Sequence, residues 1–397
     1  MIFTTYWFHA FAMVVVAVYW LLRRQRHRFW FLGLACLVFH YHFAGPAGMA
    51  PILILMLATY LAGLKGTRWA CNTAMALCVA TLCFYKYSVF LIDAAISPLS
   101  LRTAEHLTQS TVSLLPSLPP LGISFFTFEF VHYLVEVRRG GEPIRSPLRF
   151  LLFAIFFPSL VAGPIKRYPQ FLASLDEGSR RLEPSHLAAG LVRMAVGFFK
   201  KVVIADNLTF YVTTNSPDFA ALGLGERWLF LAAVSFRILM DFSGYSDIAI
   251  GAAQLLGVRL PENFNWPYLA GNIRDFWQRW HISLSSWIRD YIYIPLGGNR
   301  LGLGRRAVNG FISFAVIGLW HGPAWNFVLW GLYHGAGLAA SSTYTSVPVV
   351  GPSLTKIFTK EPLVAWASTQ LFVWLGWLLF FYPVPVAWNM AKLLFTK

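Results

Sequence analysis

A single histidine interrupts one of the longest apolar stretches of the chain. His321 lies in GLWHGPAWNFVLWGLYHG, residues 318–335, directly before Gly322 and Pro323. This pair breaks a helix and frees backbone groups that, at membrane depth, only protein or a polar cavity can satisfy. Neutral imidazole accepts a proton near neutral pH, so His321 is a candidate general base. A helix-end histidine that binds a freed carbonyl explains the same residues equally well.

A second histidine lies on an apolar stripe in RDFWQRWHISLSSWIRDYIYIPLGGNR, residues 274–300. Read as one helix, the segment places seven side chains at three- and four-residue spacing: Trp277, Trp280, His281, Leu284, Trp287, Ile288 and Tyr291. The pattern predicts an amphipathic helix in the cytoplasmic half of a membrane, ended by Pro295 and Gly297–Gly298. By pattern alone, a core histidine bound to a backbone carbonyl is the more common explanation of His281.

The remaining polar residues within apolar runs are better explained by structural roles than by catalytic ones. His334 fits a structural role, and the three histidines of this region are spaced unlike any local metal site, so we expect no metal. Arg237 and Asp241 lie four residues apart and are expected to form an ion pair on one helix face. The alternative is that they line a polar tunnel to His321.

The composition excludes a soluble protein. Of the 397 residues, 57% are hydrophobic and only 12% are charged, which is about half the charged fraction of soluble domains. The net charge of +15 comes from basic clusters between apolar runs, the pattern of cytoplasmic loops rather than of nucleic-acid binding. The four cysteines lie in apolar runs without a C-x-x-C pair, so neither a zinc site nor a redox motif is indicated.

The apolar runs predict an all-α polytopic membrane protein with about ten spanning helices in a single domain, residues 1–397. The basic loops 23–28, 65–68, 138–149, 166–181 and 274–306 are expected in the cytoplasm, which places the N-terminus outside. Spans are expected at 2–22, 29–44, 47–64, 69–85, 121–137, 187–206, 227–257, 363–382 and 384–395, together with two apolar runs, 308–320 and 324–340, that are broken at WHGP. Residues 97–120 are expected to form an outer loop with a short surface helix. The run 150–162 is too short to cross and is expected to be re-entrant or interfacial.

Several strings together resemble the membrane-bound O-acyltransferase family, in its bacterial branch of alginate O-acetylation and teichoic acid D-alanylation. The strings are GISFFTFE (122–129), FFPSLVAGPIKRYPQF (156–171), DFSGYSDIAIG (241–251), PENFNWPY (261–268), FWQRWHISLSSWIRDYIYIPLGGNR (276–300) and GLWHG (318–322). The resemblance implies a ring of tilted helices, with re-entrant helices, around a thinned centre with a cytoplasmic funnel. It assigns His321 as the catalytic centre and His281 as its partner.

The activity implied is transfer of an acyl group, foremost acetyl, from a cytoplasmic thioester to a hydroxyl of an extracytoplasmic polysaccharide across the bacterial cytoplasmic membrane. The donor is acetyl-CoA or the phosphopantetheine of an acidic acyl carrier protein, and no cofactor is bound. A periplasmic SGNH-type acyltransferase is the expected partner, beside membrane lipid and without nucleic acid. Residues expected to bind the donor or line the tunnel are Arg274, Arg279, Trp280, Arg289, Asn265, Trp320 and Asn326.

Three other functions stay open at this point. The first is D-alanyl transfer from a carrier protein to a teichoic-acid-like polymer. The second, from another class, is transport of a glycan or lipid, which the many spans and buried charges fit but the absence of an internal repeat does not favour. The third is a scaffold that holds a periplasmic enzyme.

Overall fold

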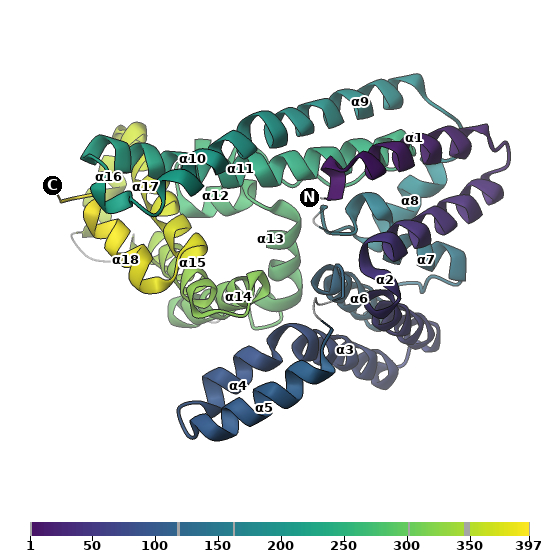
Figure 1. Ribbon diagram of the computed structural model, residues 1–397, viewed down its shortest axis with the longest axis horizontal. Coiled ribbons are helices and arrows are strands. Elements are labelled where there is room, and N and C mark those ends of the chain that lie inside the picture. The colour runs from purple at the N-terminus through teal and green to yellow at the C-terminus, as the bar shows by residue number, and fades with distance from the viewer. Residues whose placement is uncertain (1, 117–119, 162, 301, 345–349, 397) are drawn as a thin grey trace. The chain divides into compact units, whose positions relative to one another are not determined.

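The computed structural model describes residues 2–116, 120–161, 163–300, 302–344 and 350–396, and every regular element among them is helical (Figure 1). The prediction of an all-α chain is confirmed. By their internal contacts the residues group into two compact units, 1–196 with 245–261 and 197–244 with 262–397. The assignment of a single domain stays a prediction.

Unit 1 begins with long apolar helices. They are α1 (Tyr6–Leu21), α2 (Gln25–Lys65), α3 (Arg68–Leu82), a π-helix (Cys83–Tyr87), α4 (Ser88–Ile96) and α5 (Leu101–Leu114). Within α2, Gly45 leaves helical geometry, at φ 64° and ψ 177°, so that two helices meet across a kink where the sequence separates the spans 29–44 and 47–64. Glycine pays no Cβ penalty at positive φ, so the helix resumes at once on either side. Helices α4 and α5 form a hairpin, which includes the short helix expected within 97–120 (Figure 1).

The rest of unit 1 surrounds a short buried helix. Its elements are α6 (Ile123–Arg138), α7 (Pro147–Ile155), a 3-10 turn (Phe157–Ser159), α8 (Tyr168–Gly178) and most of α9 (Pro184–Phe198). Helix α7 has nine residues, about 14 Å at 1.5 Å per residue, which is too short to cross a bilayer. Leu152, Phe153 and Phe156 are fully buried, so the described residues 150–161 pack largely inside the protein. That the run is re-entrant or interfacial stays a prediction.

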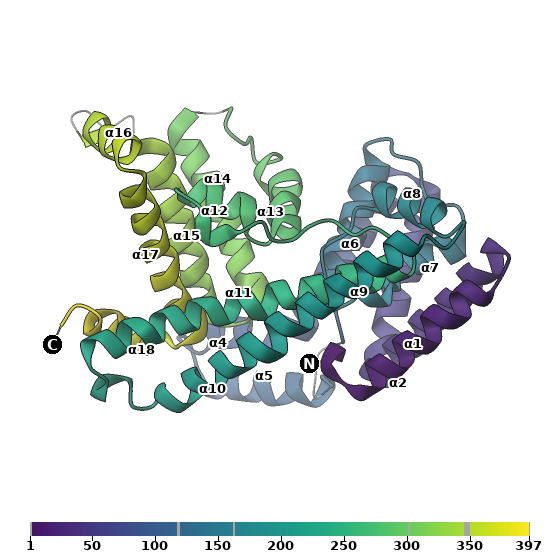
Figure 2. The same ribbon diagram turned by 90° about the horizontal axis from the view of Figure 1, so that it is seen from above.

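Unit 2 carries both candidate histidines. Its elements are a π-helix (Phe199–Ala205), α10 (Asp206–Asn215), a 3-10 turn (Phe219–Ala221), most of α11 (Leu224–Leu255), a 3-10 turn (Pro267–Leu269), α12 (Ile273–Arg279), α13 (Ile282–Ile288), a π-helix (Arg289–Tyr293), α14 (Gly302–His321), α15 (Trp325–Thr343), α16 (Val350–Lys360), α17 (Pro362–Phe381) and α18 (Val384–Leu393). Helices α14, α15 and α17 lie side by side (Figure 2).

Two glycines let α14 and α15 touch along their backbones. A Cβ added to Gly318 would lie 2.2 Å from the carbonyl oxygen of Phe327, and one added to Gly331 would lie 2.2 Å from that of Phe314. Small residues at such crossings allow membrane helices to pack by close van der Waals contact. The contact fixes the ends of both helices and therefore the position of His321.

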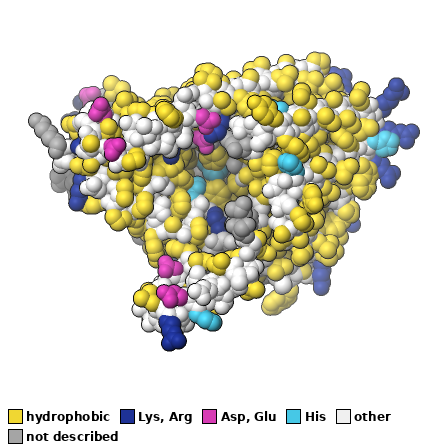
Figure 3. All heavy atoms as spheres, viewed as in Figure 1, with side chains coloured by type: hydrophobic (Ala, Val, Ile, Leu, Met, Phe, Trp, Pro, Cys, Tyr) yellow, Lys and Arg dark blue, Asp and Glu magenta, His cyan; other side chains and the backbone are white. Residues whose placement is uncertain are grey.

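In the part of the chain that the structure describes, four helices are long and apolar enough to cross a membrane: Gln25–Lys65, Arg68–Ile96 with its π-helical turn, Leu224–Leu255 and Pro362–Phe381. Hydrophobic side chains cover most of the face seen in Figure 3. The chain is therefore a multi-pass membrane protein. The count of about ten spans, and the side of the membrane on which each loop lies, stay predictions.

Candidate active site

His321 is the last residue of α14, directly before the Gly322–Pro323 break. Its ring lies in an aromatic cage: the centroid distances are 5.1 Å to Trp330 and 4.9 Å to Phe380, both edge to face, and 6.3 Å to Phe327. The imidazole is half-buried. Helices α14, α15 and α17 thus hold the candidate base at a helix end, where the sequence predicts it.

His281 lies at a break that the sequence does not predict. The expected continuous helix through residues 274–294 is wrong: α12 ends at Arg279, α13 begins at Ile282, and His281 has φ 44° and ψ 55° between them. A side chain in this left-handed region is strained by about 1–2 kcal/mol, and such strain gathers at functional sites. The break turns the imidazole inward, where it is 1% exposed.

A neighbouring loop holds this strained backbone in place. The Asn265 N–H donates to the carbonyl of Arg279 at 2.9 Å, and the Ile282 N–H donates to the carbonyl of Asn263 at 2.9 Å. The Ser283 hydroxyl donates to the fully buried side-chain oxygen of Asn263 at 2.8 Å. Asn265, expected at the donor site or tunnel, therefore contributes backbone hydrogen bonds that fix His281.

The imidazole of His281 meets one aromatic ring edge to face. It lies 4.6 Å from Phe242, and its Nε2 has no hydrogen-bond partner among the described residues. Burial lowers the pKa of His281 to about 3, so the ring is neutral at physiological pH. A buried nitrogen without a partner costs free energy, which a bound polar group would recover.

Trp320 connects the two histidines. Its ring lies 5.7 Å from His281 and 4.7 Å from His321, centroid to centroid. Asn326 donates its amide to the carbonyl of Phe380 at 3.4 Å, next to the His321 cage. The structure therefore brings both histidines, Trp320 and Asn326 into one neighbourhood of unit 2.

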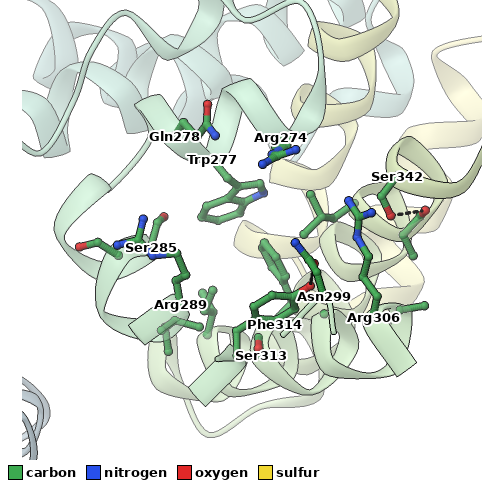
Figure 4. A pocket seen from close by; sticks show the side chains of 18 of the residues that line it. Arg274, Trp277, Gln278, Ser285, Arg289, Asn299, Arg306, Ser313, Phe314 and Ser342 are labelled. Carbon is green, nitrogen blue, oxygen red and sulfur yellow. Dashed lines mark hydrogen bonds between the residues drawn. The ribbon is translucent and has the colours of Figure 1, made fainter. Parts of the chain in front are cut away.

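The predicted donor residues separate into two groups. Arg274 and Arg289 line a cavity of about 380 Å³ between α12, α13, α14 and α15 (Figure 4). Arg279 instead pairs with Asp275, Nε to oxygen 2.7 Å, and does not line this cavity. Trp280 is buried, with its ring 5.6 Å from Phe276 and 4.9 Å from Trp377. Neither histidine belongs to the cavity lining.

Sequence reasoning missed part of this cavity. Arg306, Gly310, Ser313 and Ile317 line it from α14, together with Asn299. The four α14 residues follow one another at three- and four-residue spacing, which is one face of a helix. That periodicity, with an arginine at its polar end, is the signal from which the face could have been found.

The expected Arg237–Asp241 ion pair is not what the structure shows. Lys201 pairs with Asp241 and also with Asp206, both at 2.6 Å, while the Arg237 guanidinium lies 4.1 Å above the ring of Phe381. A close contact between helices selects the partner, because a Cβ on Gly244 would lie 3.1 Å from the backbone nitrogen of Lys201.

Further buried polar contacts lie in both units. In unit 1, Arg193 pairs with Asp247 at 2.7 Å and Glu129 pairs with Lys166 at 2.6 Å. In unit 2, His334 is fully buried among aromatic rings, including Trp277 at 5.2 Å and Trp330 at 4.8 Å.

Fold and site together define a helical membrane protein with two histidines around a tryptophan, beside an arginine-lined cavity. The chain belongs to the membrane-bound O-acyltransferase family, whose model matches residues 67–348.

Three curated relatives illustrate the range of the family. The probable alginate O-acetylase of Azotobacter vinelandii is 36% identical over 332 residues, 83% of this chain and 63% of that protein. The peptidoglycan O-acetyltransferase of Helicobacter pylori is 33% identical over 328 residues, 76% of this chain and 60% of that protein. The teichoic acid D-alanyltransferase of Bacillus subtilis is 35% identical over 223 residues, 54% of this chain and 56% of that protein. The chain thus spans less than two thirds of the length of these relatives.

Proposed function

We propose that the protein is an O-acyltransferase of the bacterial cell envelope, with His321 as general base. The observation that carries the proposal is His321 itself, an ionisable side chain at a helix break, caged by aromatic rings and linked through Trp320 to a second buried histidine. An ionisable side chain inside a membrane protein costs free energy to bury, and it is therefore a functional candidate for that reason alone. The names of the relatives, which are acetyl- and alanyltransferases, support the same reaction class.

In the proposed reaction, Nε2 or Nδ1 of neutral His321 takes the proton of the acceptor hydroxyl. At the same time, the oxygen of this hydroxyl attacks the carbonyl carbon of the thioester. The tetrahedral intermediate collapses with loss of the thiolate, which takes the proton from the imidazolium, and an ester and a thiol are formed. His281 is placed to bind donor or acceptor and to assist at the developing oxyanion. Holding both reactants at one place supplies the orientation that this step needs.

For the substrates, we propose an acetyl group drawn from a cytoplasmic thioester and an extracytoplasmic polysaccharide as the final acceptor. The relatives named for alginate and peptidoglycan O-acetylation support acetyl, whereas the relative named for teichoic acid supports D-alanyl as the second candidate. The donor is acetyl-CoA or an acidic carrier protein, and a periplasmic SGNH-type acyltransferase passes the group to the polymer. The expected location of the protein is the bacterial cytoplasmic membrane, with the N-terminus outside the cytoplasm.

The test is His321→Gln, which keeps the size and a hydrogen bond but accepts no proton. Loss of a general base costs roughly 10²–10⁴-fold, so acylated polymer per membrane-inserted protein should fall below detection in cells with the partners present. His106→Gln, at an exposed position of α5, is the matched control and should retain wild-type acylation. Near-normal acylation by His321→Gln would refute the proposal. If the protein were a transporter, His321→Gln would reduce uptake of the substrate without any effect on ester formation in membranes. If it were a scaffold, acylation would tolerate His321→Gln.

A further inference from the structure

One arginine of unit 2 lies within a membrane-spanning helix without an ion pair. Arg237 belongs to α11, one of the helices that are long and apolar enough to cross a membrane. It is half-buried, and its guanidinium forms no ion pair with a residue that the structure describes. The group that it contacts is the ring of Phe381, at 4.1 Å. A charge inside a span is costly and is normally paired, so this arginine is a candidate for binding an anion.

The ring below the Arg237 guanidinium is connected to the candidate base. The ring centroids of Phe381 and Phe380 are 5.2 Å apart, edge to face, and that of Phe380 is 4.9 Å from that of His321. The two phenylalanines end α17, next to the end of α14. By the lengths of these contacts, a molecule no longer than one monosaccharide unit can reach the guanidinium and the imidazole together.

Arg237 lies at the end of unit 2 that is further from the arginine-lined cavity. The residues of α14 that line the cavity end at Ile317, and His321 follows one turn later. Helices α10, α11, α17 and α18 meet at this end (Figure 2). Since residues 274–306 are expected in the cytoplasm, the end near Arg237 is on the expected extracytoplasmic side. This is the side from which the proposed acceptor comes.

The charges around Arg237 favour a carboxylate over a phosphate monoester. Asp241 acts on the guanidinium electrostatically, but its ion-pair partner is Lys201, which also pairs with Asp206. These four side chains together carry no net charge, so they repel a doubly charged group more strongly than a singly charged one. The Phe381 ring covers one face of the guanidinium and leaves the N–H donors at its edge. Through this edge, arginine binds a planar carboxylate by two parallel hydrogen bonds.

We propose that Arg237 binds a carboxylate of the acyl acceptor, which is then a hydroxyl compound with a carboxylate within one monosaccharide unit of the reacting oxygen. The carboxylate lies at the edge of the guanidinium, and the hydroxyl lies at His321. Arg237 thus contributes to the affinity and selectivity for the acceptor, whereas proton transfer stays with His321. The inference rests on the proposed function for the hydroxyl end alone, because binding of the carboxylate is measured without any transfer.

The experiment measures binding to the full chain in phosphatidylcholine nanodiscs by saturation-transfer NMR. The probes are methyl β-D-glucuronoside and methyl β-D-glucoside, which share their ring hydroxyls and differ in a carboxylate against a hydroxymethyl group. A charge-assisted hydrogen bond is worth about tenfold or more in affinity. Wild type should therefore bind the glucuronoside at least about tenfold more tightly than the glucoside, and Arg237→Gln should raise the Kd of the glucuronoside by a similar factor.

Three comparisons make the test specific. Arg237→Gln should leave the Kd of the glucoside unchanged, because the lost interaction is with the carboxylate. Arg237→Lys keeps the charge without the paired donors and should recover part of the affinity, which separates a binding effect from misfolding. Lys392→Gln is the matched control. It removes another cation that lies over an aromatic ring, 5.4 Å from that of Trp388 in α18, and it should bind both probes as wild type does.

Several outcomes would overturn the inference. One is equal affinity of wild type for the two probes, or no measurable binding of the glucuronoside, and another is the same loss in Lys392→Gln as in Arg237→Gln. A third is Arg237-dependent retention of phosphatidylglycerol with no such dependence for the glucuronoside, which would make Arg237 a lipid ligand. The His321→Gln variant separates the two proposals: it should keep the preference for the glucuronoside, and if it also acylates normally, only the proposed base is wrong.

Discussion

The imidazole of His281 lies 5.7 Å from the indole of Trp320, the residue immediately before His321. The same indole lies 4.7 Å from the imidazole of His321, so one tryptophan ring contacts both histidines. His281 belongs to a loop between short helices and His321 to the end of a long one. Their meeting depends on two different helix breaks.

The first prediction tests whether the His281 ring is needed apart from its backbone. Asparagine adopts the left-handed conformation of residue 281 at least as readily as histidine does. His281→Asn should therefore fold like wild type, whereas His281→Ala should be less stable by about 1 kcal/mol. Both should lose most acylation, measured per folded protein, with thermal unfolding as the structural readout. Near-normal acylation by His281→Asn would show that the residue only shapes the chain.

The second prediction concerns pH. The folded pKa of His281, about 3, lies below the ordinary value of 6.5, so folding disfavours its protonation. Its contribution to stability is complete above pH 6.5 and is lost as the pH falls toward 3, at up to about 1.4 kcal/mol per pH unit. Wild type should therefore lose thermal stability relative to His281→Asn between pH 7 and pH 5. Parallel curves for the two proteins would contradict a buried, neutral ring.

The third prediction concerns the contact of α14 and α15. In Gly318→Ala, the new methyl group would meet the Phe327 carbonyl oxygen, so the helices must separate, at a cost of about 1–3 kcal/mol. Because His321 ends α14, transfer should fall with stability. Gly304→Ala, in the same helix with open space around it, should be neutral or slightly stabilising. If both variants melt alike, the close contact does not exist in the folded protein.

The fourth prediction concerns the buried ion pair of unit 1. Lys166 and Glu129 are 2.6 Å apart with side chains only 2% and 5% exposed. Lys166→Met leaves a buried carboxylate alone and should cost about 3–5 kcal/mol, whereas Glu129→Leu combined with Lys166→Met should restore much of that loss. Arg139→Gln, which breaks an exposed pair with Glu136, should change stability by less than about 1 kcal/mol. The apparent unfolding midpoint in detergent decides, and a double variant as unstable as the single one would refute the account.

The sequence by itself determines the class of the protein and the two histidines. Apolar runs predict segments that are buried in lipid, and the Gly322–Pro323 pair predicts the end of a helix. Both predictions depend only on residues close together in the sequence. The same local logic identifies the short run 150–162 as unable to cross, and the kink at Gly45 as a break in helical geometry. Arg274 and Arg289 are also found this way, since they flank an aromatic stripe.

Only the tertiary structure decides how these pieces meet. The stripe through His281 has the spacing of one continuous helix. The break there is stabilised by two backbone hydrogen bonds, one donated by the Asn265 N–H and one accepted by the Asn263 carbonyl. Asp241 has Arg237 one turn away on its own helix, yet pairs with Lys201 from a preceding helix, because Gly244 permits the approach. The periodicity of apolar residues in the sequence predicts only which side chains share one face of a single helix. Partners across helices are selected by close packing, to which residues distant in the sequence contribute together.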